Sequence, residues 1–161
     1  MKFPRIIHLD PSDARVFDPP AEPGEPALPG SFAFTDTDPE SLGNKARRAF
    51  HHGWLGIGSF GRATFVQIGE IDEAGFEDVV EQLTVHFVAH YGAPNREAAH
   101  PVARAQAEDA VELCTGAPGT LLSIERDMTE QGLSERVRAI HREPARDPAP
   151  AWTIDNDASE D

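Results

Sequence analysis

Cysteine is almost missing from this chain of 161 residues, in which Cys114 is the only one. A single cysteine cannot form an internal disulfide, and such a composition is typical of proteins from a reducing compartment. The sequence also lacks any run of about 18 apolar residues, the length that a membrane helix needs. Its N-terminus lacks the apolar core of a secretory signal peptide. We therefore expect a cytoplasmic protein.

Lysine is also scarce, with Lys2 and Lys45 the only two. Acidic residues outnumber basic ones by 28 to 14, which gives a formal net charge of −14 at pH 7. Binding to nucleic acid depends largely on neutralising phosphates, and anionic membrane surfaces also attract basic residues. The charge therefore argues against nucleic acid and membrane as partners, and we expect any macromolecular partner to be another protein. The sequence indicates no oligomeric state.

Glycine and proline, with 13 and 14 residues, divide the chain into short elements. Asp38, Pro39 and Gly53 predict a helix between them, because Asp caps helix N-termini, Pro suits the first turn and Gly ends helices. Apolar spacing predicts two further helices, and alternation between turn residues predicts strands. The predicted helices are 39–53, 75–91 and 100–114; the predicted strands are 5–9, 14–17 and 31–34, with hairpins over 54–71 and 121–141 and an irregular loop over 18–30.

This order of elements lacks a regular alternation of strand and helix, which favours an antiparallel or mixed sheet. We predict an α+β fold in which about three helices pack on a sheet of short strands and hairpins. Residues 1–142 are predicted to form a single globular domain, because this length suits one hydrophobic core. Residues 143–161 are rich in proline and then in acid, so we predict a disordered tail there.

The most distinctive motif is the string over residues 55–62, in which Gly56, Gly58 and Gly61 have G-x-G-x-x-G spacing. It resembles the loop that protein kinases fold over ATP phosphates. A kinase also needs a lysine on the next strand and the H-R-D and D-F-G motifs, which this chain lacks. A dinucleotide fingerprint would have to open a helix, whereas a strand is predicted after this motif. We therefore interpret it as a glycine hairpin that packs closely against a neighbour.

The alternative is that the glycine hairpin binds an anion. The missing side chains would leave room for a phosphate or similar group, and Arg62 or Lys45 would supply positive charge. Lys45 shares one face of its helix with Arg48 and His52, and this is the only basic cluster of an acidic chain. The cluster is either a solvated face that pairs with nearby acids or a site for an anionic ligand or an acidic partner segment.

His86 and His90 stand four residues apart on the predicted helix over 75–91, a spacing that metal ligands use. A zinc protease would have Glu between them at the position of Phe87, and the sequence specifies no third ligand. Half-buried histidines with backbone or carboxylate partners are the other interpretation. We expect no metal and no cofactor.

Three stretches of the chain are distinctive when they are taken together. They are Ser12-Asp13 with Arg15-Val16-Phe17 and Glu22-Pro23-Gly24-Glu25, then Ala49-Phe50 with Gly53-Trp54-Leu55-Gly56 and Phe60-Gly61-Arg62-Ala63-Thr64, and finally Tyr91-Gly92-Ala93-Pro94. With these stretches the chain resembles a family of uncharacterised bacterial proteins, defined only as a domain of unknown function, over about residues 3–141. The resemblance implies a cytoplasmic bacterial protein with no established activity, and it carries over no catalytic residue.

No coherent set of catalytic residues emerges from the sequence. We therefore favour a non-catalytic accessory or protein-interaction domain, because the acidic body, the basic face and the loop over 18–30 suit contact with a partner. The alternative is a small ligand- or metal-binding protein, or an enzyme, that uses the glycine hairpin and the helix with His86 and His90.

Overall fold

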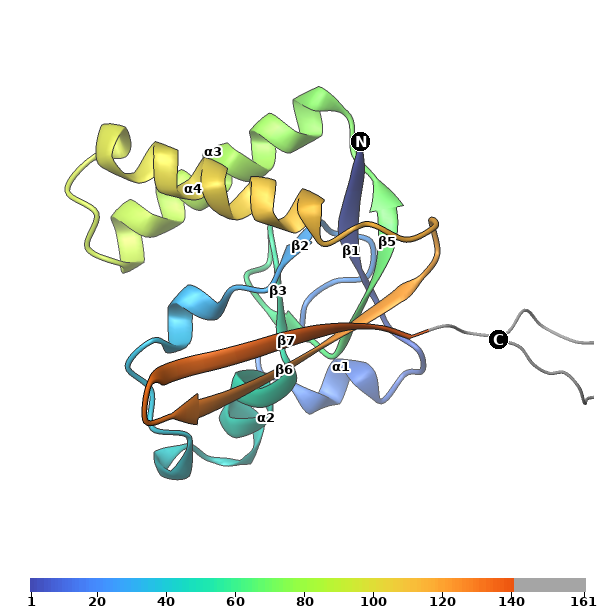
Figure 1. Cartoon of the computed structure of the whole chain (residues 1–161), viewed down its shortest axis with the longest axis vertical. Helices are drawn as coiled ribbons and strands as arrows, with labels where there is room; N and C mark the ends of the chain where they lie inside the picture. The colour runs from blue at the N-terminus through green and yellow to red at the C-terminus, as the bar shows by residue number, and fades with distance from the viewer. Residues whose placement is uncertain (141–161) are drawn as a thin grey trace, which may run out of the picture.

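The structure, a computed structural model, describes residues 1–140. The strands are β1 (Lys2–Ile7), β2 (Ala27–Leu28), β3 (Trp54–Gly56), β4 (Arg62–Ala63), β5 (Phe65–Glu70), β6 (Leu121–Thr129) and β7 (Gly132–Ile140). The helices are α1 (Asp13–Val16), α2 (Asn44–His52), α3 (Glu73–His90) and α4 (Arg96–Glu112), with 3₁₀ turns η1 (Ser31–Phe34) and η2 (Pro39–Ser41). These elements form the predicted α+β fold (Figure 1).

Two antiparallel sheets organise these elements. The larger has the strand order β1-β5-β6-β7, and the smaller has the order β2-β3-β4. β5 pairs with β6 only at Val66↔Leu122 and Gln67↔Leu121, whereas β6 pairs with β7 from Leu121↔Ile140 to Thr129↔Gly132. Most of the β6–β7 hairpin therefore extends beyond β5, and α2 packs against it (Figure 1).

The long helices α3 and α4 lie side by side over the sheets (Figure 1). The carboxylate of Asp72 caps α3 by accepting a hydrogen bond from the Gly75 N–H, which confirms the predicted helix with a start two residues earlier. Asn95 caps α4 by accepting from the Ala98 N–H. This cap moves the helix start upstream of the predicted residue 100 and leaves Pro101 inside α4. The buried face of α4 is a stripe of small residues that allows close packing on the core: Ala99, Ala103, Ala107 and Ala110.

Two predicted strands are wrong. Residues 14–17 largely form α1, because the carboxylate of Asp13 accepts the Leu9 N–H and its own N–H donates to the Asp10 carbonyl, which closes a turn. Residues 31–34 form η1 after Gly30, which turns the chain in the left-handed region at φ 67°. Phe32 and Phe34 stand two residues apart, as apolar residues of a strand do. Here they lie in a 3₁₀ turn, and their rings contact different neighbours.

Three other predictions needed adjustment. The helix predicted over 39–53 is divided, because Asp38 caps only the short η2 and α2 begins after Gly43. The predicted hairpin over 54–71 forms as β3 and β4, but β5 leaves it to join the larger sheet. The loop over 18–30 contains β2, which pairs with β3. The closing hairpin over 121–141 is confirmed, whereas the predicted tail over 143–161 lies outside the described residues.

Arg126 on β6 has its side chain in the interior, with only 1 % of the residue exposed. Its guanidinium donates hydrogen bonds to the carbonyls of Phe50, at 3.0 Å, and Gly53, at 2.9 Å, where α2 ends. It also donates to the Pro29 carbonyl, and its Nε donates to Ser31 Oγ at 2.6 Å. One side chain therefore connects β6, the end of α2 and the start of η1.

Arg62 on β4 shares this environment, since it donates to the carbonyls of Gly30, at 3.0 Å, and Gly53, at 3.1 Å. The Phe34 ring lies over both guanidinium groups, with its centre 4.6 Å from that of Arg62 and 5.1 Å from that of Arg126. Burial and the neighbouring Arg126 lower the pKa of Arg62 to about 9. Burial lowers the pKa of Arg126 to about 10, against the opposing effect of Glu135. Both side chains therefore stay charged at pH 7.

Replacing Arg126 should be among the most destabilising changes in the domain. Arg126→Met leaves buried carbonyls without donors, and we expect it to cost about 3–5 kcal/mol, as is typical when one partner of a buried charged network is removed. The control Arg136→Met removes an exposed arginine that pairs with Glu125 at 2.7 Å, and should leave the stability nearly unchanged because exposed ion pairs contribute little. Urea unfolding of both variants measures the difference; equal costs would contradict this role for Arg126.

Candidate functional site

The glycine hairpin between β3 and β4 encloses a carboxylate of the chain itself. Glu25 accepts hydrogen bonds from the Ser59 N–H, at 2.9 Å, and from Ser59 Oγ, at 2.5 Å. A Cβ at Gly56 would lie 2.6 Å from Glu25 Oε2, and one at Gly58 would lie 2.9 Å from Oε1. Gly58 also has a φ of +135°, where an L side chain is strained. The space that an anionic ligand would need beside these two glycines is taken by Glu25.

The other members of the predicted anion site point elsewhere. Gly61 lies against the backbone of Pro20, so that a Cβ would overlap the Pro20 carbonyl. The guanidinium of Arg62 is bound to interior carbonyls, as described above. Lys45 and Arg48 are exposed on α2, and within residues 1–140 no hydrogen bond or ion pair joins them to the glycine hairpin. Whether any of these residues binds a ligand stays a prediction.

His52, the third member of the basic cluster, is half-buried with its neighbour His51 against β6. His51 Nδ1 lies 2.9 Å from the Arg126 carbonyl, and His52 Nδ1 lies 3.2 Å from the Ile124 carbonyl. A carbonyl oxygen only accepts, so both Nδ1 atoms donate their protons to it. The two rings thereby occupy the edge of β6 that β5 leaves unpaired.

His86 and His90 face each other on α3, with ring centroids 4.9 Å apart. The ring of His86 stacks on Phe60 of the glycine hairpin at 3.9 Å and an interplanar angle of 9°. Partial burial, with smaller contributions from His90 and Arg62, lowers the pKa of His86. Among the described residues, no group of three or more His, Cys, Asp or Glu side chains is arranged to hold a metal ion. The expected absence of a metal remains a prediction.

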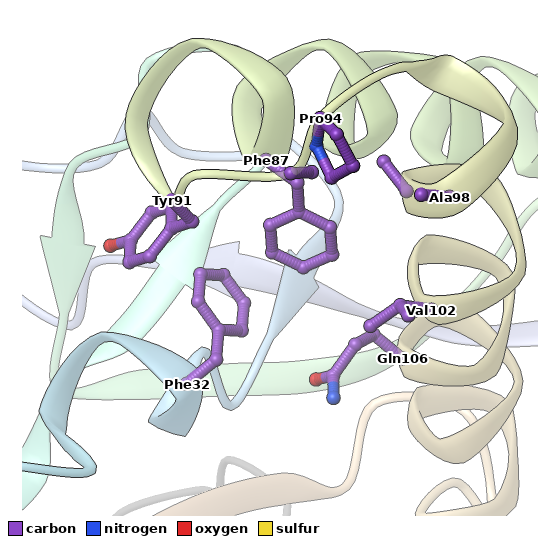
Figure 2. A pocket seen from close by; sticks show the side chains of 9 residues that line it. Phe32, Phe87, Tyr91, Pro94, Ala98, Val102 and Gln106 are labelled. Atoms are coloured by element: carbon purple, nitrogen blue, oxygen red, sulfur yellow. The ribbon is translucent and has the colours of Figure 1, made fainter.

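A hollow that no sequence pattern indicated lies between η1, the end of α3 and the start of α4 (Figure 2). We call it the apolar hollow; its volume is about 330 Å³. Phe32 rises from η1 toward Phe87 and Tyr91 of α3, at centroid distances of 4.9 and 5.2 Å with edge-to-face geometry. The remaining lining residues are Ala93, Pro94, Ala98, Ala99, Val102 and Gln106.

A second hollow of about 380 Å³ adjoins the first and shares Phe32 and Gln106 with it. We call it the acidic hollow, because the carboxylates of Asp109 on α4 and Glu135 on β7 line it. Its other lining residues are Pro29, Ser31, Thr35, Leu113 and Leu133. The two hollows form one groove along α4, which we call the α4 groove. Its residues come from four separate segments, 29–35, 87–94, 98–113 and 133–135, so no local motif could have predicted it.

A family model described as a family of unknown function, DUF6505, matches residues 1–151. The chain belongs to this family. The match extends beyond the predicted end near residue 141 and takes in the first part of the predicted tail. No curated protein and no solved structure matches this DUF6505 member. Within residues 1–140 none of its helices combines the length and apolar character that a membrane crossing requires.

Alanine substitutions test the role of the glycines in this DUF6505 domain. Gly61→Ala should destabilise it by about 1–3 kcal/mol through overpacking against Pro20, and Gly58→Ala by about 1 kcal/mol or more through backbone strain. Gly116→Ala is the control: its Cβ would meet ordinary contacts at 3.4 Å, so we expect a change within about 0.5 kcal/mol. Millimolar ATP or NAD should not shift the thermal melt. A nucleotide-induced shift that Gly58→Ala removes without destabilising the domain would support ligand binding instead.

The electrostatic coupling between His86 and His90 is testable by NMR titration of the imidazole protons. The pKa of His86 should lie below 6.5, its ordinary value, because burial and the nearby charges disfavour the imidazolium. His90→Ala should raise it, since one of these positive neighbours is gone. Because the pKa of His86 is lower in the folded state than in the unfolded state, the free energy of unfolding decreases as the pH falls below the unfolded-state pKa. His86→Phe lacks this group, so we expect it to lose less stability at acidic pH. An unchanged His86 pKa in His90→Ala would contradict the coupling.

Proposed function

We propose that this domain is a non-catalytic protein-interaction domain and that its partner binds in the α4 groove. The observation that carries the proposal is the junction of an apolar hollow with an acidic one. Tyr91, with 45 % of its surface exposed, and Val102, with 52 %, leave apolar surface open to solvent at the first hollow. Exposed apolar patches beside hollows mark interaction sites more often than isolated exposed residues do.

The lining of the apolar hollow suits an anchoring side chain of a partner. Energetically important interface residues are usually large side chains that fill a well-packed pocket. Here the rings of Phe32 and Phe87 are held by edge-to-face contacts, so the pocket exists before binding and little conformational entropy is lost. We expect an aromatic or large aliphatic side chain of the partner in this position.

The acidic hollow adds a charge requirement. The carboxylate of Asp109 has no ion-pair or hydrogen-bonding partner among the described residues, whereas Glu135 lies 3.6 Å from Arg126 and accepts a hydrogen bond from Ser31. The net charge of −14 would in addition attract a basic segment over long distances. The proposed partner segment therefore carries a lysine or arginine near its apolar anchor.

The size of the apolar hollow favours a second candidate function. Its volume of about 330 Å³ lies at the lower end of the range of small-molecule sites, about 300–1,000 Å³. The Gln106 side chain supplies an amide among apolar neighbours, which is a pattern that orients small apolar ligands (Figure 2). A small apolar molecule with one polar group is the ligand class for this alternative.

Two valine variants test whether a partner binds in the α4 groove. Random peptides selected by phage display on the full-length protein should be enriched in large apolar residues next to lysine or arginine. Their dissociation constants, measured by fluorescence polarisation, should rise at least about tenfold in Val102→Glu, because a charge is placed in the apolar hollow. Binding should also weaken with added salt.

The matched control is Val85→Glu, since Val85 is an equally exposed valine, at 51 %, on α3 and does not line the groove. We expect wild-type affinity for this variant. If both variants bind the selected peptides equally, the peptides bind elsewhere and the proposal is wrong. If no peptide is selected but an apolar dye binds the wild type and not Val102→Glu, the small-molecule alternative is favoured.

A further inference from the structure

The larger sheet has one long edge that the described part of the chain leaves open. The outer edge of β1 is covered at Ile6 by the loop before β2, where Ile6 N–H donates to the Glu25 carbonyl and Gly24 N–H to the Ile6 carbonyl. The edge of β6 beyond β5 receives the imidazoles of α2. β7, in contrast, pairs with β6 alone, and no other backbone bond to its nine residues exists within residues 1–140.

This edge of β7 is regular over its whole length. Its register with β6 is unbroken, and it contains no proline or bulge that would prevent further pairing. In an antiparallel pair, alternate residues direct both backbone groups away from the partner strand. Within the described part of the chain, β7 therefore presents a series of N–H and C=O groups without backbone partners. Natural sheets usually protect such edges, so an open one is a site for another strand.

The side chains of β7 divide by charge between its two faces. Leu133 and Glu135 line the acidic hollow, so this face of the strand borders the α4 groove. Arg136 and Arg138 alternate with them and are exposed on the opposite face. Directly opposed side chains in a sheet lie on the same face. A strand added to β7 would therefore place some side chains opposite Leu133 and Glu135, and the alternate ones opposite Arg136 and Arg138.

A second copy of the chain fits this edge poorly. A two-fold axis perpendicular to the sheet would pair β7 with its own copy in registers centred on single residues. Registers centred on residues 135 to 138 bring Glu135 opposite Glu135, or one of the two arginines opposite an arginine. Like charges directly opposed across strands are destabilising. The charge pattern of β7 therefore selects against self-pairing.

We propose that an extended segment of the partner protein adds to β7 as a fifth strand of the larger sheet. This inference rests on the proposed function and specifies the form of the partner. The segment carries acidic residues opposite Arg136 and Arg138, a basic residue opposite Glu135 and apolar residues opposite Val137 and Leu133. Written antiparallel to β7, this pattern is Glu-Val-Glu-Lys-Thr-Leu. The basic residue then lies on the side of the acidic hollow and its Asp109.

The test measures binding of the full-length protein to a synthetic peptide of that sequence, which carries a fluorescent label and flanking Gly-Ser residues. Fluorescence polarisation should show at least about tenfold tighter binding than for the charge-swapped peptide Lys-Val-Lys-Glu-Thr-Leu. In the Arg138→Glu variant this preference should shrink or reverse. Hydrogen exchange should slow at alternate amides of β7 and stay unchanged in β1.

N-methylated peptides separate strand addition from docking by side chains alone. Methylating one alternate set of backbone nitrogens should abolish binding, and methylating the other set should preserve it, because only one set faces β7. Equal effects of both sets, or no binding of the parent peptide at millimolar concentration, overturn the inference. The proposed function fails separately, through the Val102→Glu comparison with selected peptides.

Two further measurements test other possible occupants of this edge, namely a second copy of the chain and the chain's own residues 141–161. Sedimentation of the protein alone should show no dimer that Arg138→Glu strengthens or weakens. A synthetic peptide of residues 141–161 should not compete with the probe peptide. A dimer that depends on Arg138, or competition by the chain's own C-terminal segment, would assign β7 to that occupant and overturn the inference.

Discussion

The structure depends most on two positive charges that stand side by side, one on the buried Arg126 and one on the partly buried Arg62. Among residues 1–140, the carboxylate of Glu135 pairs with Arg126, and backbone carbonyls accept hydrogen bonds from both guanidinium groups. The carbonyls at the end of α2 carry the partial negative charge of a helix C-terminus, which stabilises a cation there. Because a buried charge without such partners is very costly, the ends of α2, β4 and β6 are fixed relative to one another. Polar geometry at this point therefore adds to the apolar packing that forms the rest of the core.

The α4 groove is a consequence of that constraint. η1 has no buried residue of its own and would be poorly held by apolar packing. It is held instead because Ser31 accepts from Arg126 and the Phe34 ring covers both guanidinium groups. Between these two anchors, Phe32 is directed the other way, toward Phe87 and Tyr91. One side of η1 therefore packs against Arg62 and Arg126, and its other side forms the wall that both hollows share.

The sequence predicted the elements whose signals are local. The apolar spacing over residues 75–91 predicted α3, and the two hairpins followed from their turn residues. It failed where a distant partner decides the conformation, as in η1, which depends on Arg126 some 95 positions later. The groove was missed for the same reason, since an exposed Val102 becomes part of a site only when η1 lies beside it. The burial of Arg126 also lacks a sequence signature, because arginine in a strand is ordinarily expected on the exposed face.

The glycine hairpin and β7 show opposite ways of treating backbone groups. In the hairpin, Ser59 N–H is satisfied internally by Glu25, and the glycines allow the carboxylate and the Pro20 backbone to come close. The motif that most resembled a ligand site is thus occupied by the chain itself. β7 has no such internal partner among residues 1–140, and it borders a hollow whose Asp109 is likewise uncompensated. Surface that a folded chain has satisfied resists new contacts, since binding must first break the old ones. Polar groups that have no partner can be covered without breaking an existing bond, so we expect a partner to bind at β7 and α4.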